Sequence, residues 1–256
     1  MEPAIMIKQS VNEQELPLDG WKPDPCADHE LTEDELIMPY PPVSLLSSTH
    51  IVGEKNSLVG HKLTLLRDKH TSSSDFRTII GEVTTIIGVE ALSHLETQPV
   101  TIETPICRTV GRVIAGLKQV IVPIMRAGMG MEPAMKALLP KARTGHIGLY
   151  RDEQTLEPKA YFIKMPKNIE ERMALILDPM LATGGSADAA IKMLKERGCQ
   201  KINFLCVVAA PRGVDLLQTD HPDVELWIGA LDKGLNKNGY IVPGLGDAGD
   251  RIFGTK

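Results

Sequence analysis

Residues Asp178 to Ser186, DPMLATGGS, combine a carboxylate with a loop of small residues that could hold a phosphate. The apolar run Ala174–Leu177 before them predicts a buried strand, and apolar residues recur at helical spacing after them, up to Gly198. Glycines let an anion approach the backbone N–H groups at a helix N-terminus, where the helix dipole also favours negative charge. Thr183 and Ser186 add hydroxyl donors. The stretch is therefore predicted to be a phosphate-binding loop.

Other phosphate motifs do not fit this loop. No lysine follows its second glycine, as a Walker loop requires, and the spacing G-x-G-x-x-G is absent. Asp178 suits a ligand that carries a sugar as well as a phosphate, because a carboxylate accepts hydrogen bonds from ribose hydroxyls. The alternative is an ordinary glycine-rich turn between a strand and a helix, and the position of Asp178 weighs against it.

A second candidate anion site is Arg126 to Gly130, RAGMG, which directly follows the strand-like run Gln119–Met125. An arginine beside two glycines offers an explicit positive charge and close backbone approach. A tight turn with a solvated arginine is the alternative, and taken alone it would be favoured. The two loops support each other only if the fold brings them together.

Strand and helix patterns alternate from Val120 to Ile228, which predicts an α/β fold with a parallel sheet and right-handed crossovers. Both loops then lie at the carboxyl ends of strands, where such sheets bind ligands. A long amphipathic helix is predicted over Ser74–Leu95, as core or as a dimer contact.

Composition limits the possible functions. The chain has 256 residues and a net charge of −5, and its first 46 residues hold ten acidic and two basic side chains. We predict an acidic, proline-rich N-terminal extension over residues 1–48 and one catalytic domain over 49–256. The nearly neutral body lacks the basic face that nucleic acid requires. Without a membrane span, a secretory signal or paired cysteine spacing, the sequence predicts a cytoplasmic protein.

Four motifs together resemble one family. LDPMLATGGS resembles the 5-phosphoribosyl 1-diphosphate (PRPP) loop of uracil phosphoribosyltransferases, and Gly239–Lys256, GYIVPGLGDAGDRIFGTK, resembles their uracil-binding segment. Val122–Gly128, VPIMRAG, and Leu149–Pro158, LYRDEQTLEP, resemble two further motifs. They occur in the family's order, over about Leu58 to Lys256. The resemblance implies a type I phosphoribosyltransferase fold with flanking helices, a β-arm or lid, and a C-terminal hood over about 231–256.

The resemblance also implies a reaction, uracil plus PRPP giving UMP plus diphosphate, and a set of site residues. Catalytic roles fall to Asp178, Arg126 and Asp247. The implied PRPP ligands are Arg126, Arg151, Asp178, Pro179, Met180, Leu181, Ala182, Thr183, Gly184, Gly185, Ser186 and Asp247. The implied uracil ligands are Tyr240, Ile241, Gly246, Asp247 and Ala248. Mg²⁺ is the expected cofactor, held mainly by PRPP near Asp247 rather than by direct protein ligands.

The family resemblance further implies a homodimer or higher oligomer, GTP as an effector in part of the family, and a candidate cis peptide bond at Arg126–Ala127. A phosphoribosyltransferase for another base is the nearest alternative, and the hood sequence favours uracil. A PRPP-fold regulator that senses nucleotides or binds RNA, with little catalysis, is the alternative from another class. It would need a basic face, and the body of this chain gives no sign of one.

Overall fold

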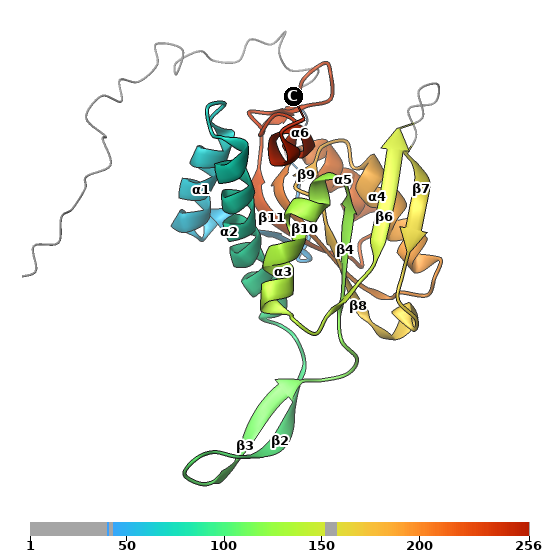
Figure 1. Cartoon of the computed structure of the whole chain (residues 1–256). Helices are drawn as coiled ribbons and strands as arrows, with labels where there is room; N and C mark the ends of the chain where they lie inside the picture. The colour runs from blue at the N-terminus through green and yellow to red at the C-terminus, as the bar shows by residue number, and fades with distance from the viewer. Residues whose placement is uncertain (1–39, 41–42, 152–157, 256) are drawn as a thin grey trace, which may run out of the picture.

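A computed structural model describes residue 40, residues 43–151 and residues 158–255 of the chain. Its centre is a nine-stranded sheet in the order β1-β11-β10-β8-β4-β6-β7, with β5 beside β4 and β9 beside β10 (Figure 1). The strands are β1 (Thr49–Ile51), β4 (Val120–Met125), β5 (Arg143–Thr144), β6 (His146–Arg151), β7 (Pro158–Lys164), β8 (Met173–Leu177), β9 (Met180–Leu181), β10 (Lys201–Ala209) and β11 (Glu225–Leu231). All pairs in this sheet are parallel except β6 with β7. The predicted parallel α/β fold is confirmed.

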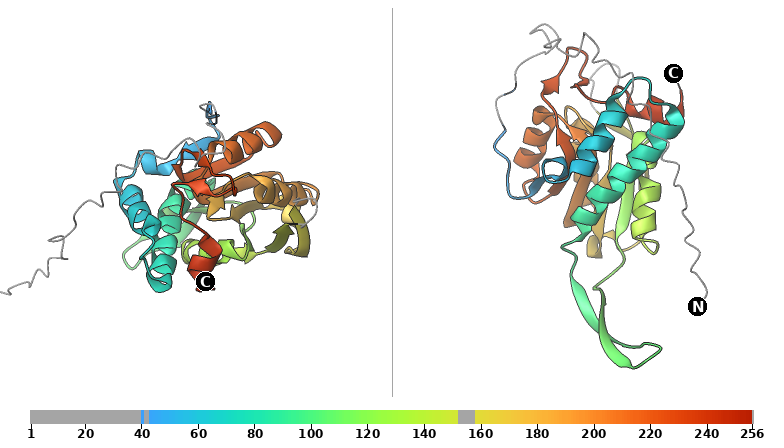
Figure 2. Two further views of the ribbon diagram at one scale, coloured as in Figure 1. Left: turned by 90° about the horizontal axis from the view of Figure 1, so that it is seen from above. Right: turned by 90° about the vertical axis from the view of Figure 1, so that its left-hand side faces the viewer.

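Helices cover both faces of the sheet (Figure 2). One face carries α1 (Ser57–Arg67), α2 (Ser73–Leu92) and α3 (Glu132–Leu138), and the other carries α4 (Gly185–Lys195) and α5 (Pro211–Asp220). Successive strand residues point to opposite faces, so Leu175 and Leu177 join the first core cluster while Ala174 and Ile176 join the second. Because helices cover both faces of the sheet, the central strands are apolar at nearly every position.

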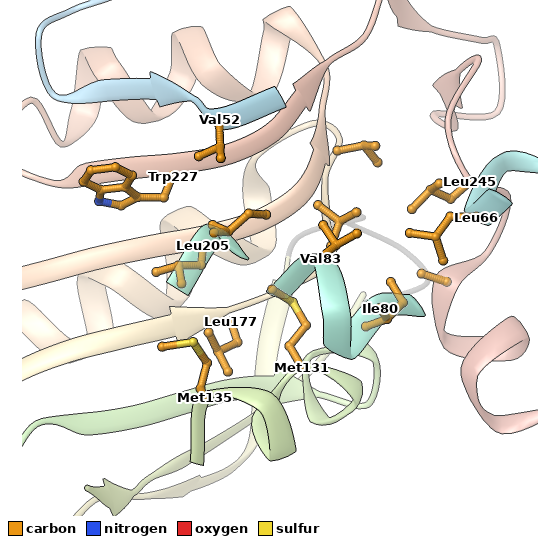
Figure 3. Close-up of a cluster of buried hydrophobic side chains, with 14 of the residues drawn as sticks. Val52, Leu66, Ile80, Val83, Met131, Met135, Leu177, Leu205, Trp227 and Leu245 are labelled. Carbon is orange, nitrogen blue, oxygen red and sulfur yellow. The ribbon is translucent and has the colours of Figure 1, made fainter. Parts of the chain in front are cut away.

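The larger core cluster packs the sheet against α2 (Figure 3). Leu177 and Leu205 of the sheet share this cluster with Ile80 and Val83 of the helix, and all four side chains are fully buried. Each such side chain contributes roughly 1.5–3 kcal/mol when it leaves water. The predicted apolar stripe of this helix is therefore core. Its members Phe76, Ile79, Ile80, Val83 and Ile87 are buried, and Ile86 is partly buried.

Two segments stand apart from the main sheet. A hairpin of β2 (Thr97–Glu103) and β3 (Arg108–Ile114) projects from the body (Figure 1). The C-terminal hood contains β12 (Gly234–Leu235), β13 (Ile241–Val242) and α6 (Ala248–Phe253). In Figure 3 its Leu245 lies beside Leu66 of α1, which joins the hood to the core. The glycine-rich end of the chain is thus a folded cover.

Most of the predicted N-terminal extension lies outside the described residues. Tyr40 donates a hydrogen bond of 2.8 Å to Asp215 of α5, and the Leu46 N–H donates one of 2.9 Å to Gln218 of the same helix. The first strand begins at Thr49. In the described part of the chain, no helix is long and apolar enough to cross a membrane.

Candidate active site

The two predicted anion loops follow neighbouring parallel strands, β4 and β8, which pair through Pro123 and Leu177. The loop after β4 lies directly against the end of β8, because a Cβ built on Gly128 would be 2.2 Å from the Leu177 carbonyl oxygen. Only glycine fits there without moving the backbone. The fold therefore brings the Arg126 loop to Asp178, at the carboxyl ends of strands where the sequence predicts both loops.

The loop after β8 is fixed before it reaches the helix. Met180 and Leu181 form β9 and pair with β10, so the chain stays on the sheet for four residues beyond Leu177. Gly184 then turns the chain with φ +89° and caps α4, and a Cβ on it would lie 2.7 Å from Leu216. The first backbone N–H groups of an α-helix have no partner within the helix. Those at the start of α4 suit the phosphate site that the sequence predicts.

Asp178 lies at the carboxyl end of β8 and is half-buried. Burial raises the pKa of its carboxyl group to about 7, and a hydrogen bond of 3.3 Å from the Met180 N–H lowers this pKa in part. Burial, followed by the charge of Asp178, raises the pKa of the Cys206 thiol well above its usual value. Asp178 therefore keeps its proton to a higher pH than an exposed aspartate does.

Arg126 follows β4 and begins the short 3-10 helix η4 (Ala127–Gly130). Its guanidinium lies 3.4 Å from Asp250 of the hood and 5.9 Å from the ring centre of Phe253, with 57% of the side chain exposed. The cis peptide bond of this loop joins Met125 to Arg126. The expected cis bond at Arg126–Ala127 is therefore wrong by one residue. The guanidinium remains accessible to an anion.

The hood packs against the Arg126 loop. A Cβ built on Gly130 would lie 2.8 Å from Ile252, and one on Gly249 would lie 3.8 Å from Ala127. Asp247 caps α6, because its carboxylate accepts a hydrogen bond of 3.0 Å from the Asp250 N–H.

The predicted uracil ligands fall on the turns of the hood. Gly246 has φ +71°, a conformation that side chains rarely adopt. Ile241 and Ala248 are buried, whereas Tyr240 is 38% exposed at the rim.

Arg151 ends β6, and its backbone lies opposite Pro158 at the start of β7. The Pro158 ring is 3.9 Å from a Cβ built on Gly185, so the base of this arm lies beside the phosphate loop. Residues 152–157, which carry the rest of the predicted lid, and the side chain of Arg151 lie outside the described part of the structure. The arm thus returns to the site, as the sequence motif suggests.

Sequence reasoning missed the residues that hold the hood. Arg67 donates hydrogen bonds of 2.8 and 2.6 Å to both carboxylate oxygens of Asp232, and one of 3.0 Å to the Gly244 carbonyl. Arg251 donates to Leu245 at 2.9 Å, and Arg77 donates to the Ile252 carbonyl at 2.8 Å. A charged residue within a glycine-rich apolar segment, such as Asp232, is the signal that could have indicated an anchor.

The chain is similar to known proteins of one family. The family model described as uracil phosphoribosyltransferase matches residues 53–255. A uracil phosphoribosyltransferase of Clostridium botulinum is 54% identical over 167 residues, which are 65% of this chain and 80% of that protein. One from Streptococcus pneumoniae is 56% identical over 169 residues, 66% of this chain and 81% of that protein.

Among solved structures, the AQ2163 protein of Aquifex aeolicus superposes with a TM-score of 0.73 at 33% identity, over 77% of this chain and 94% of its own. Adenine phosphoribosyltransferase of Trypanosoma brucei superposes with a TM-score of 0.50 at 12% identity, over 74% of this chain and 86% of its own. The second likeness concerns the fold alone.

Proposed function

The chain belongs to the uracil phosphoribosyltransferase family, which converts uracil and PRPP to UMP and diphosphate, and we propose how its residues carry out this reaction. The observation that carries the proposal is the convergence of the Arg126 loop, Asp178 and the hood. Gly128 lies against Leu177, directly before Asp178, and the hood meets the same loop through Asp250 and Ile252. Each of the three parts then binds one part of the substrates.

The 5′-phosphate of PRPP binds at the start of α4. Backbone N–H groups of Gly185 and Ser186, with the hydroxyls of Thr183 and Ser186, surround it, and the helix dipole adds to the attraction. Asp178 accepts hydrogen bonds from the ribose hydroxyls. These bonds favour the ionised carboxylate and lower its pKa from the value near 7 that burial alone produces. The ribose hydroxyls therefore stabilise the charged Asp178 carboxylate, which burial alone disfavours.

The diphosphate of PRPP binds on the other side of the ribose, at Arg126, and the family resemblance adds Arg151 as a second ligand. Asp247 and Asp250 place carboxylate oxygens beside the Arg126 loop, and such oxygens fit Mg²⁺ carried in by a diphosphate. When bound, Mg²⁺ neutralises charge that gathers on the leaving diphosphate. Arg126 and Arg151 stabilise the same charge as the bond from C1 to the diphosphate breaks.

Uracil binds under the hood. Backbone groups of Ile241, Gly246 and Ala248 match its carbonyl and N–H groups, while Tyr240 closes the rim. The left-handed turn at Gly246 keeps a side chain away from the flat ring. Cytosine would leave a buried polar group unpaired, at a cost of about 1–3 kcal/mol. The site orients N1 of uracil towards C1 of the ribose, and the reaction needs no strong general base.

We also propose a homodimer whose subunits meet through the projecting β2–β3 hairpin. Among the described strands, β2 and β3 pair only with each other, yet the hairpin exposes large apolar side chains, with Ile106 exposed by 93% and Val110 by 67%. Apolar groups concentrated on a protruding element are typical of a contact surface. GTP activation is a further proposal, which rests on the family resemblance, as does a cytoplasmic location.

The reaction is tested by product formation with PRPP and Mg²⁺ against uracil, cytosine, orotate, hypoxanthine and no base, each with and without GTP. UMP from uracil alone supports the proposal in full. Turnover of another base would overturn the assignment of the hood. Loss of turnover when Mg²⁺ is removed by a chelator is expected, and unchanged turnover would contradict the role of the metal.

A further inference from the structure

A cavity of about 430 Å³ lies between the hood and the loop that joins α1 to α2, next to the site described above. One wall is the loop between α1 and α2 with the first residue of α2, and the other wall is the hood. The lining residues are Lys69, Thr71, Ser73, Tyr240, Asp247, Asp250 and Arg251. The two walls are about 170 positions apart in the chain, so no local sequence pattern shows this cavity.

The cavity continues from the diphosphate side of the proposed site. Asp247 belongs to both, and Asp250, on the cavity wall, lies 3.4 Å from the guanidinium of Arg126. A diphosphate held by Arg126 therefore lies next to this cavity. The carboxylates of Asp247 and Asp250 would repel a bare diphosphate, so a further positive charge on the opposite wall would favour binding.

Lys69 supplies that charge. It is exposed, and within the described part of the chain no hydrogen bond or ion pair engages its ammonium group. A lysine ammonium is a compact point charge on a flexible stem, which suits a phosphate group that must also leave. No residue assigned above performs this task from the α1–α2 loop.

The loop that carries Lys69 is held firmly although its side chain is free. The Arg251 guanidinium donates to the Leu66 and Asp68 carbonyl oxygens, and its Cζ lies 4.2 Å from the ring centre of Phe76. Thr71 closes the loop by donating its hydroxyl to the Leu65 carbonyl at 2.5 Å. These contacts tie the loop to the hood, so Lys69 can bind a phosphate without first ordering its backbone.

We propose that Lys69 is a binding residue for the diphosphate, and that it contacts the outer phosphate group from across this cavity both in PRPP and in the released product. The inference rests on the proposed function, because it requires the diphosphate to lie at Arg126. It adds a residue from a segment of the chain that the motifs of the active site do not include. UMP carries no diphosphate, so Lys69 does not contribute to UMP binding.

The test compares Lys69→Ala and Lys69→Arg with the wild-type protein. Lys201→Ala is the matched control, since this exposed lysine begins β10 at the opposite end of the sheet from the site. In Lys69→Ala, the KM for PRPP and the inhibition constant for diphosphate are expected to rise about tenfold, as for loss of one charge-assisted hydrogen bond. In the same variant, the KM for uracil and the inhibition constant for UMP are expected to stay within twofold of wild type, and the Tm is expected not to shift. Lys69→Arg is expected to restore most of the affinity for PRPP and diphosphate.

Calorimetric titration of diphosphate with Mg²⁺ into each variant separates this inference from the proposed function, because it needs no turnover. Weaker diphosphate binding by Lys69→Ala alone supports the role of Lys69 even if uracil proves to be the wrong base. Diphosphate binding within twofold of wild type overturns it, whatever the activity. A parallel loss of UMP affinity or Tm would also overturn it, because it would show a merely structural role.

Discussion

Asp178 is expected to destabilise the ligand-free protein at neutral and alkaline pH. Its pKa is raised from 3.8 to about 7, chiefly by burial. Between these two values the folded protein binds more protons than the unfolded chain, so the free energy of unfolding falls as pH rises through this range. The cost is absent below about pH 4 and complete above about pH 7.

The magnitude follows from the size of the shift. A shift of about three pKa units corresponds to an upper limit of roughly 4 kcal/mol, and water around a half-buried carboxylate reduces this to about 2 kcal/mol. Asp178→Asn removes the charge and keeps an oxygen that can accept the hydrogen bond from the Met180 N–H. We therefore expect the variant to be about 2 kcal/mol more stable than wild type at pH 8 and equally stable at pH 4.

Urea unfolding followed by circular dichroism at pH 4, 6 and 8, without substrates, measures this difference. Asp188→Asn is the control, because Asp188 accepts hydrogen bonds from His221 and Lys192, each at 2.9 Å, and its loss should destabilise the protein. In the assay with uracil and PRPP, Asp178→Asn is expected to lose about 10- to 100-fold in turnover, since ribose bonds to a charged acceptor are weakened. A variant no more stable than wild type at pH 8 would refute the reasoning on burial.

Three further substitutions, the first with a control variant, test the supporting parts. Gly128→Ala places a Cβ against the Leu177 carbonyl and should lower both Tm and turnover. The control is Gly60→Ala, which has open space around it and should leave turnover unchanged while stabilising α1 by about 0.5–1 kcal/mol. Equal effects of the two substitutions on Tm and turnover would contradict the loop contact. Arg67→Met removes the ion-pair partner of Asp232, whose side chain is only 4% exposed. We therefore expect the free energy of unfolding to fall by about 3–5 kcal/mol and the KM for uracil to rise. An unchanged KM would argue against anchoring of the hood by this pair. Val110→Lys should yield monomers in light scattering, and a persistent dimer would reject the hairpin contact.

The sequence predicts the central sheet well because its strands are buried on both faces and its loops carry glycines at fixed places. Gly128 and Gly184 are needed for close backbone contact and for a left-handed turn, so local pattern and tertiary need coincide. The motif spacing likewise indicates that Asp178 and Arg126 both follow strands, and the pairing of β4 with β8 brings them together.

Other features depend on contacts distant in sequence and could not be predicted. A strand over residues 100–104 is predictable, but its pairing as a separate hairpin with β3 is not, because both strands expose apolar and polar side chains alike. β1 is three residues long and joins the sheet by pairing with β11. The anchoring of Asp232 by Arg67 spans 165 positions, so neither residue shows its role in its own neighbourhood.

A crystal structure with uracil and a PRPP analogue that cannot release diphosphate tests the central claim most directly. The account predicts the 5′-phosphate on the N–H groups of Gly185 and Ser186, the ribose hydroxyls on Asp178, the diphosphate at Arg126 and the base under Gly246. A phosphate bound away from the start of α4, or a ribose without contact to Asp178, would contradict it.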